Sequence, residues 1–451
     1  MWYKGAMVQA PLQRSPAELV RAIGRWSMVA LAVNSIVGSG IFGLPAPVAG
    51  FLGRASPLAV LLAGAGMGVI IACYGEVASQ FTETGGTYLY LRHAFGRLAG
   101  LQVVWLMLLS RLTAVAAAVN LLVTYLAEFW PRATQPVPRL AIITGFIGVL
   151  AAVNCRGVGA GTQMSNATVV AKLGALGLVC AAGIVWLTSH PAVTALPVTA
   201  DADSWLKAML LLLFAYGGYE AALNPMGEAR DPRRDVTFAL FAALLIVTVL
   251  YSVLQWVVVE VLADPAKSQR PLADAARVML GEPGAALISI GALVSVYGYV
   301  SANMLTTPRG IFAPAQAGDL PALLGAVHPR WRTPYVAIAV FAVLLWAFSQ
   351  FASFSWNVTL SAVSRIVYYA GICAAVPVLR RTQPAAAAFR VPGGLTLPVL
   401  GIAICALLLT RVDFGKSLIL LATIAVALLN WALARDASPM SRTEKSKPVE
   451  P

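Results

Sequence analysis

AVNSIVGSGIFGLPAPVAG, from Ala32 to Gly50, is the stretch of sequence that decides the fold. It lies in an apolar run that is long enough to cross a bilayer as one helix. Helix-interrupting residues crowd its middle, at Gly38, Ser39, Gly40, Gly43, Pro45 and Pro47. Glycine lowers helix stability through its backbone entropy, and proline removes a backbone donor. The run therefore predicts a membrane-spanning helix that is broken near its centre.

The composition of the whole chain is that of a membrane protein. Of the 451 residues, 59% are hydrophobic and 11% are charged, whereas soluble domains carry roughly 25% charged residues. Apolar runs of roughly 20 residues recur, which suits helices that cross a hydrocarbon core of about 30 Å. We predict an all-α polytopic membrane protein with about twelve spans, at residues 27–52, 57–81, 98–128, 138–154, 163–188, 205–226, 237–263, 285–311, 334–351, 356–379, 395–411 and 416–434.

Basic residues predict the orientation of these spans. Most of the 32 Lys and Arg fall on the side of the membrane that also holds both termini, and cytoplasmic loops carry such an excess. We therefore expect both termini to be cytoplasmic, in a multi-pass protein of the plasma (inner) membrane. Inner-leaflet lipid then explains the net charge of +13, and no nucleic-acid partner is needed. The oligomeric state stays open.

The spans leave no room for a soluble domain. Residues 1–26 form a cytoplasmic N-terminal segment, and 435–451 form a polar cytoplasmic tail. Spans one to five (27–190) and spans six to ten (204–381) form two halves of opposite topology, because an odd number of spans inverts the second half. The last two spans, 395–434, lie outside this repeat.

The sixth span carries a matching interruption. LLLFAYGGYEAALNPMGEARDP, from Leu211 to Pro232, has Gly217 and Gly218 at its middle. The first and sixth spans open the two halves, and paired interruptions at corresponding positions point to a transporter site at the membrane midplane. The alternative is that these glycines only permit close helix packing. We favour the site, because the two breaks fall at equivalent places.

A broken helix offers bare backbone groups inside the membrane. The half before the break ends in free carbonyls that attract a cation, and the half after it begins with free N–H groups that attract an anion. In the first span these ends fall near Ile36 and near Gly40–Ile41, and the sixth span adds carbonyls near Phe214 to Gly217. An α-amino acid fits two such poles, because one carbon carries its carboxylate and its ammonium.

Five stretches resemble the amino acid–polyamine–organocation superfamily of secondary transporters. In chain order they are GSGIF (38–42), ACYGEVASQFTETGGTYLYLRHAFG (72–96), FAYGGYEAALNPMGEARDPRRD (214–235), ANMLTTPRGIFAPAQAGDLP (302–321) and RIVYYAGICAAVPVLRR (365–381). The resemblance implies a LeuT-type five-plus-five inverted repeat with a discontinuous first and sixth helix, plus two peripheral helices. The substrate-binding residues that we expect from it are Ile36, Gly38, Ser39, Gly40, Ile41, Phe214, Gly217 and Gly218.

Lys172 lies about ten residues into the fifth span. Burial favours the neutral form of a lysine, so a lysine at this depth is able to cycle a proton or to stand in for a bound cation. By the resemblance, sodium-independent members hold a lysine here near carbonyls of the first span and a hydroxyl of the eighth, for which Ser295 is the candidate. The alternative, a lysine that snorkels to the inner interface, is disfavoured by its depth.

Other charged residues fall inside the spans. Glu220 resembles the family's gate-linked acid, and a structural role is an equally weighted alternative. Glu76 is expected to be structural. Arg111 and Arg365 are expected to form ion pairs or to cap carbonyls. If Arg111 faces the vestibule, it biases the site against cationic side chains.

No metal site or enzyme motif is expected. The three histidines are expected in loops without metal-ligand spacing, at positions His93, His190 and His328. The five cysteines form no C-x-x-C pair, and no G-x-S-x-G or H-E-x-x-H motif occurs. We expect no cofactor, with a proton as the coupling ion.

These observations predict a secondary active amino acid transporter that works by alternating access. It is expected to be sodium-independent, and either proton-coupled or an exchanger. A pocket that is apolar apart from Arg111 favours neutral amino acids. A polyamine or organic-cation carrier on the same fold is the alternative. Its substrate has no carboxylate, so the free backbone N–H groups near Gly40–Ile41 would stay unused. A nutrient sensor with little flux stays open as well.

Overall fold

The structure is a computed structural model that describes residues 23–82, 85–157, 161–190, 200–316, 318, 320–383 and 387–437. In this part of the chain the regular structure is helical, apart from one isolated parallel bridge between Ile23 and Ala229. That bridge ties the start of the first span to the end of the sixth. Most of the expected terminal segments lies outside the described residues.

The first half of the chain forms eight α-helices and two short 3₁₀ helices among the described residues. They are α1 (Arg25–Ile36), α2 (Ser39–Gly43), α3 (Pro45–Leu52), η1 (Gly53–Ala55), α4 (Ser56–Ala78), α5 (Gly86–Phe95), α6 (Arg97–Leu126), η2 (Pro131–Thr134), α7 (Pro136–Arg156) and α8 (Gly161–Ser189). The second half begins with α9 (Ala202–Tyr216), η3 (Tyr219–Glu228), α10 (Pro232–Val261), η4 (Pro265–Lys267), α11 (Pro271–Gln316), η5 (Ala322–Gly325), α12 (Tyr335–Phe351) and α13 (Phe354–Thr382). Two further helices follow, α14 (Thr396–Leu409) and α15 (Phe414–Ala437).

Within the described chain, ten helical stretches are long and apolar enough to cross a membrane. The expected ninth and eleventh spans correspond to the shorter apolar helices α12 and α14. One boundary differs clearly, because α11 starts at Pro271 whereas the eighth span was expected from residue 285. Gly281 has non-helical dihedrals inside α11, with φ at 74°, so a short helix precedes the span across a kink.

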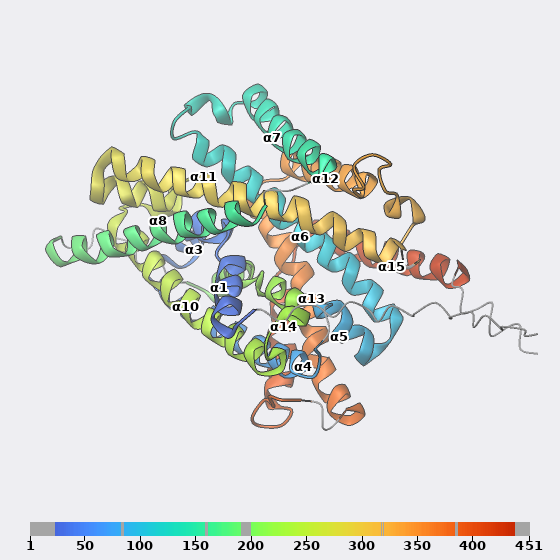
Figure 1. The fold of residues 1–451 in the computed structure, drawn as a ribbon. Coiled ribbons are helices and arrows are strands. Elements are labelled where there is room, and N and C mark those ends of the chain that lie inside the picture. The colour runs from blue at the N-terminus through green and yellow to red at the C-terminus, as the bar shows by residue number, and fades with distance from the viewer. Residues whose placement is uncertain are drawn as a thin grey trace, which may run out of the picture.

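Helix packing has the symmetry that an inverted repeat predicts. Exchanging the two halves of the chain turns each helix pair below into an equivalent pair. If spans one to five correspond to spans six to ten, then α4 corresponds to α10, α6 to α11 and α8 to α13. The pairs α4–α10 and α6–α11 pack together, and each is its own counterpart under this exchange. The pairs α6–α13 and α8–α11 also pack together, and the exchange turns one into the other. Figure 1 shows α8 and α11 running side by side across the molecule.

One segment that was expected to be a loop is a helix. Helix α5 packs on α6 and α13, and it carries His93, so the expectation that this histidine lies in a loop is wrong. Glycines with positive φ bound the helix, Gly85 at 157° and Gly96 at 85°, and they let the chain turn sharply at both ends. The His93 ring lies 5.1 Å from the ring of Phe81.

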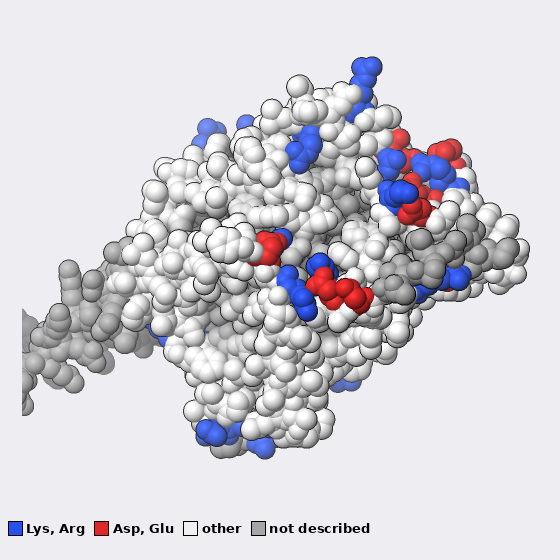
Figure 2. Space-filling model, turned by 180° about the vertical axis from the view of Figure 1, so that it is seen from behind, with Lys and Arg blue, Asp and Glu red and all other residues white. Residues whose placement is uncertain are grey.

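The surface suits a hydrocarbon environment. Large apolar side chains are exposed along several helices, among them Val149, Val185, Leu245 and Leu429. Figure 2 shows one face that is mostly uncharged, with the charged side chains gathered in a few clusters. Soluble monomers rarely expose so much contiguous apolar surface. The chain is therefore an integral, multi-pass membrane protein.

Candidate functional site

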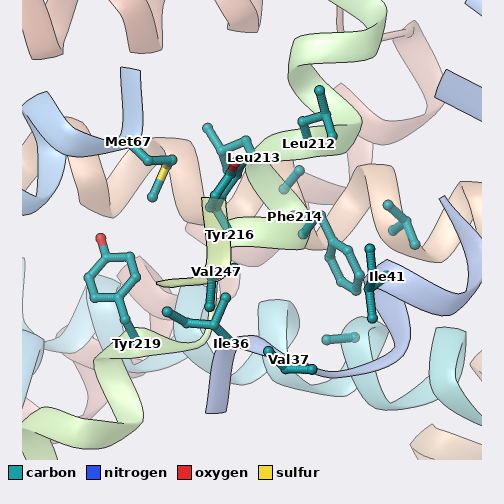
Figure 3. Packing of buried hydrophobic residues seen from close by; sticks show 14 of the residues in the cluster. Ile36, Val37, Ile41, Met67, Leu212, Leu213, Phe214, Tyr216, Tyr219 and Val247 are labelled. Atoms are coloured by element: carbon teal, nitrogen blue, oxygen red, sulfur yellow. The ribbon is translucent and has the colours of Figure 1, made fainter. Parts of the chain in front are cut away.

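The first span is broken where the sequence predicts. Helix α1 ends at Ile36, Val37 leaves the helical region with ψ at 88°, and Gly38 is extended with φ at −126° and ψ at −145°. Helix α2 then begins at Ser39. Figure 3 shows Ile36 and Val37 where the ribbon leaves the helix, with Ile41 on the next helical piece.

The sixth span is also broken where the sequence predicts. Helix α9 ends at Tyr216, Gly217 is extended, and Gly218 has φ at 109° before η3 begins. A side chain at Gly218 would lie 2.5 Å from the carbonyl oxygen of Ser35 in α1. Positive φ and this close approach both require glycine, so the two broken helices meet directly at Gly218.

Lys172 of α8 reaches the carbonyls that the break in α1 leaves bare. Its Nζ donates to the carbonyl oxygens of Asn34 at 2.7 Å and Val37 at 2.6 Å. The residue is 6% exposed, so it does not snorkel to an interface. The Tyr251 hydroxyl donates to a third carbonyl, that of Ile36, at 3.2 Å. The cation-attracting end of α1 thus holds the protein's own ammonium group.

A cavity of about 380 Å³ lies beside the two breaks. This volume is within the usual range of small-molecule sites. Its polar lining comes from α1, α6, α8, the start of η3, α11 and α13, and comprises Asn34, Ser35, Ser110, Arg111, Lys172, Glu220, Ser295, Tyr299, Asn303, Thr306, Arg365 and Tyr368. The expectation of a pocket that is apolar apart from Arg111 is therefore wrong. The polar residues are spread thinly over six elements, so no single span looked polar in the sequence.

The sequence-predicted site residues fall into two groups. Gly218, Lys172, Glu220 and Ser295 line the cavity, as does Arg111. The others are buried beside the cavity without lining it, namely Ile36, Gly38, Ser39, Gly40, Ile41, Phe214 and Gly217.

This second group packs where α2 meets α9. A side chain at Gly40 would lie 3.1 Å from the Ala215 backbone and 3.5 Å from the Phe214 ring. Figure 3 shows the Phe214 ring beside Ile41. The backbone of α2 therefore approaches α9 closely, which a larger residue at Gly40 would prevent.

Glu220 is held by three donors. Its Oε1 accepts hydrogen bonds from the hydroxyls of Tyr368 at 3.1 Å and Tyr369 at 2.5 Å, and its Oε2 accepts from the Gly218 N–H at 2.8 Å. The carboxylate thus fixes the break in the sixth span against α13. This geometry is compatible with both a structural and a gating role for Glu220, because the hydrogen-bonded residue also lines the cavity.

Arg365 of α13 covers the break in the sixth span. A side chain at Gly217 would collide with its guanidinium group, which also lies 5.6 Å from the centroid of the Phe214 ring. Its Nε donates to the hydroxyl of Ser110 in α6 at 3.0 Å. Sequence reasoning missed Ser110, because a lone serine in an apolar helix carries no signal of its own.

The side of the site formed by α2 is tightly packed. The Tyr125 hydroxyl donates to the carbonyl oxygen of Phe42 at 2.9 Å, and the two rings make an edge contact. A side chain at Gly43 would collide with the Phe354 ring. The cavity is lined by α1 residues that precede the break, so it lies on the opposite side from this packing.

Glu76 has the structural role that was expected for it. It is fully buried in α4, and its two oxygens accept from Nε and Nη2 of Arg380 at 2.6 and 2.7 Å. The backbone N–H of Val391 donates to the same carboxylate at 2.7 Å. This ion pair joins α4 to α13 away from the cavity.

Comparison with known proteins agrees with this architecture. A family model described as amino acid permease matches residues 23–433. An uncharacterised transporter of Mycobacterium tuberculosis is 30% identical over 364 residues, which cover 79% of each chain. The serine/threonine exchanger SteT of Bacillus subtilis is 28% identical over 399 residues, or 85% of this chain and 89% of SteT. The methylthioribose transporter of the same organism is 24% identical over 423 residues, or 87% and 88% of the two chains. The chain belongs to the amino acid permease family of membrane transporters.

Proposed function

We propose that this protein is a secondary active amino acid transporter that works by alternating access and does not require sodium. The observation that carries the proposal is the Lys172 ammonium group on the carbonyls of Asn34 and Val37, at the break in α1. Carbonyls exposed at a helix C-terminus attract a cation, and a sodium-coupled carrier would fill such a position with sodium. Here the protein's own lysine fills it.

The backbone supports an α-amino acid as the substrate. The first N–H groups of α2, from Ser39 to Ile41, have no partner within their helix, and such groups attract a carboxylate. They lie beside the cavity and not in its lining. The Phe214 carbonyl accepts from the Gly217 N–H, and the carbonyls that follow it, from Ala215 to Gly217, are the matching pole for an ammonium group. The name of the relative SteT, a serine/threonine exchanger, is in line with this substrate class.

The charges of the cavity disfavour the alternative, a polyamine or organic-cation carrier. Three of the described lining residues are cationic, Arg111, Lys172 and Arg365, whereas Glu220 alone is acidic. A polycation would be repelled by this wall.

The orientation expected from the basic residues places the cavity on the cytoplasmic side, because it lies on the N-terminal side of the break in α1. The packing of Phe42 with Tyr125 closes the other side. This arrangement corresponds to the inward-facing half of an alternating-access cycle.

Uptake of labelled amino acids by proteoliposomes tests the proposal. We expect uptake to persist when choline replaces sodium, and to be driven either by an inward proton gradient or by unlabelled amino acid loaded inside the vesicles. A strict requirement for sodium would contradict the role given to Lys172. Binding without any flux would indicate a nutrient sensor instead.

A further inference from the structure

We infer that the transported substrate carries a second anionic group in addition to its α-carboxylate, as a dicarboxylic amino acid does. The inference rests on the proposed function and narrows its substrate class. It starts from the three cations and one acid among the described lining residues of the cavity. A neutral amino acid brings no net charge to offset them.

Glu220 attracts Arg365 electrostatically but makes its hydrogen bonds elsewhere, so one acid stands against three cations. The oxygens of Glu220 accept from two tyrosine hydroxyls and from the Gly218 N–H, all of them neutral donors. Among the residues that the structure describes, no ion pair joins Glu220 to Arg111 or Arg365. Lys172 is already satisfied by two carbonyls. The described lining residues therefore carry more positive than negative charge.

Arg365 is buried and forms no ion pair among the described residues. It is 5% exposed, and its Nη1 has no hydrogen-bond partner among the described residues. Its guanidinium group lies over Gly217 and near the Phe214 ring, where the proposed amino acid would sit. A buried charge that lacks a direct ion pair is stabilised when a ligand supplies a further counter-charge. The unpartnered nitrogen thus marks a subsite for an anion that arrives with the substrate.

Arg111 adds a second cation to the same wall. It lies one residue after Ser110, the residue that accepts from Arg365, and it lines the same cavity. Both arginines line the same cavity as Tyr299 of α11. Planar guanidinium groups suit a carboxylate better than any neutral side chain.

The α-carboxylate does not serve as this counter-ion in the proposed site. It is assigned to the N–H groups at the start of α2, whereas Arg365 lies over the break in the sixth span. A carboxylate at the end of the side chain is the group that would reach the arginines.

A thermal-shift panel on the purified full-length protein separates the possibilities. The probes are L-aspartate and L-glutamate, their amide counterparts L-asparagine and L-glutamine, and L-lysine, each in chloride and in gluconate buffer. A ligand that binds the folded state raises its melting temperature. We expect the acidic amino acids to bind at least about tenfold more tightly than their amides, and lysine to bind least.

The outcomes are distinguishable. Equal or tighter binding of the amides would overturn the second anionic group while leaving amino acid transport intact. No shift with any amino acid would overturn both proposals.

Variants locate the subsite. Arg365→Gln and Arg111→Gln should weaken the binding of the acidic amino acid about ten- to a hundredfold, since hydrogen bonds to charged groups have this magnitude. Binding of the amide counterpart should change little. Arg132→Gln, at an exposed position of η2, is the matched control and should leave both unchanged.

If Arg365→Gln does not fold, Arg365→Lys and Arg111→Gln provide the same comparison, and the lysine should retain part of the preference for the acid. Equal losses for acid and amide would contradict the assignment of the subsite to these arginines.

Discussion

Gly218 is the residue at which the two broken helices meet. Its φ of 109° is unfavourable for any residue with a side chain, and its missing side chain leaves room for the carbonyl of Ser35. Conformational freedom and space are thus required at one position. The need for conformational freedom could be recognised from the Gly-Gly pair in the sequence. The need for space could not, because it depends on α1, which is remote in sequence.

Gly218→Ala should destabilise the protein by about 2 kcal/mol or more, because it combines backbone strain with a collision. We expect a lower melting temperature and the loss of uptake. Gly145→Ala in α7 is the matched control, since open space surrounds it and its φ is not positive. Alanine in a helix interior should leave stability unchanged or raise it by up to about 1 kcal/mol. Equal behaviour of the two variants would contradict a special backbone at Gly218.

Lys172→Ala should abolish net or proton-linked transport while the protein still folds. The substitution removes the ammonium group from the carbonyls of Asn34 and Val37, and with it the only cation that the described residues place there. Transport of a labelled amino acid is measured with and without a proton gradient. Lys207→Ala is the control, because that lysine is partly exposed and pairs with Asp203 at the start of α9. An unchanged pH dependence in Lys172→Ala would count against the coupling role.

At the scale of elements, the breaks of the first and sixth spans could be predicted because glycine and proline act locally. Most span boundaries were predictable for the same reason, from apolar runs and turn residues. Helix α5 was not, because its amphipathic sequence lies between two spans and its helicity depends on packing against α6 and α13. The polar wall of the cavity was missed since each of its six elements contributes only a few residues.

The Glu76–Arg380 ion pair is the clearest tie between elements outside the cavity, and it joins α4 to α13. Glu76→Gln should lower the free energy of unfolding by roughly 3 kcal/mol, because it leaves the Arg380 guanidinium group without its buried counter-charge. The melting temperature of the purified protein measures this loss. Arg54→Gln, which breaks an exposed pair with Glu260, should cost less than about 1 kcal/mol. A similar cost for both would mean that the buried pair is not a structural tie.

At the scale of the whole molecule, the inverted repeat places equivalent broken helices against each other, with the cavity on one side and tight packing on the other. The sequence predicts which side faces the cytoplasm only through its basic residues. A fluorescent protein fused after Pro451 should therefore fold and fluoresce, whereas alkaline phosphatase at the same place should be inactive. The opposite pair of results would show that the C-terminus lies outside the cytoplasm and that the cavity faces outward.

The most direct test of the central claim is a cryo-electron microscopy structure with the amino acid that most stabilises the protein. We predict density for the ligand between the two breaks, with its α-carboxylate on the N–H groups from Ser39 to Ile41 and its ammonium group on carbonyls from Ala215 to Gly217. A ligand bound elsewhere, or continuous helix through Gly38 and Gly218, would contradict the claim that bare peptide groups at paired helix breaks bind the substrate.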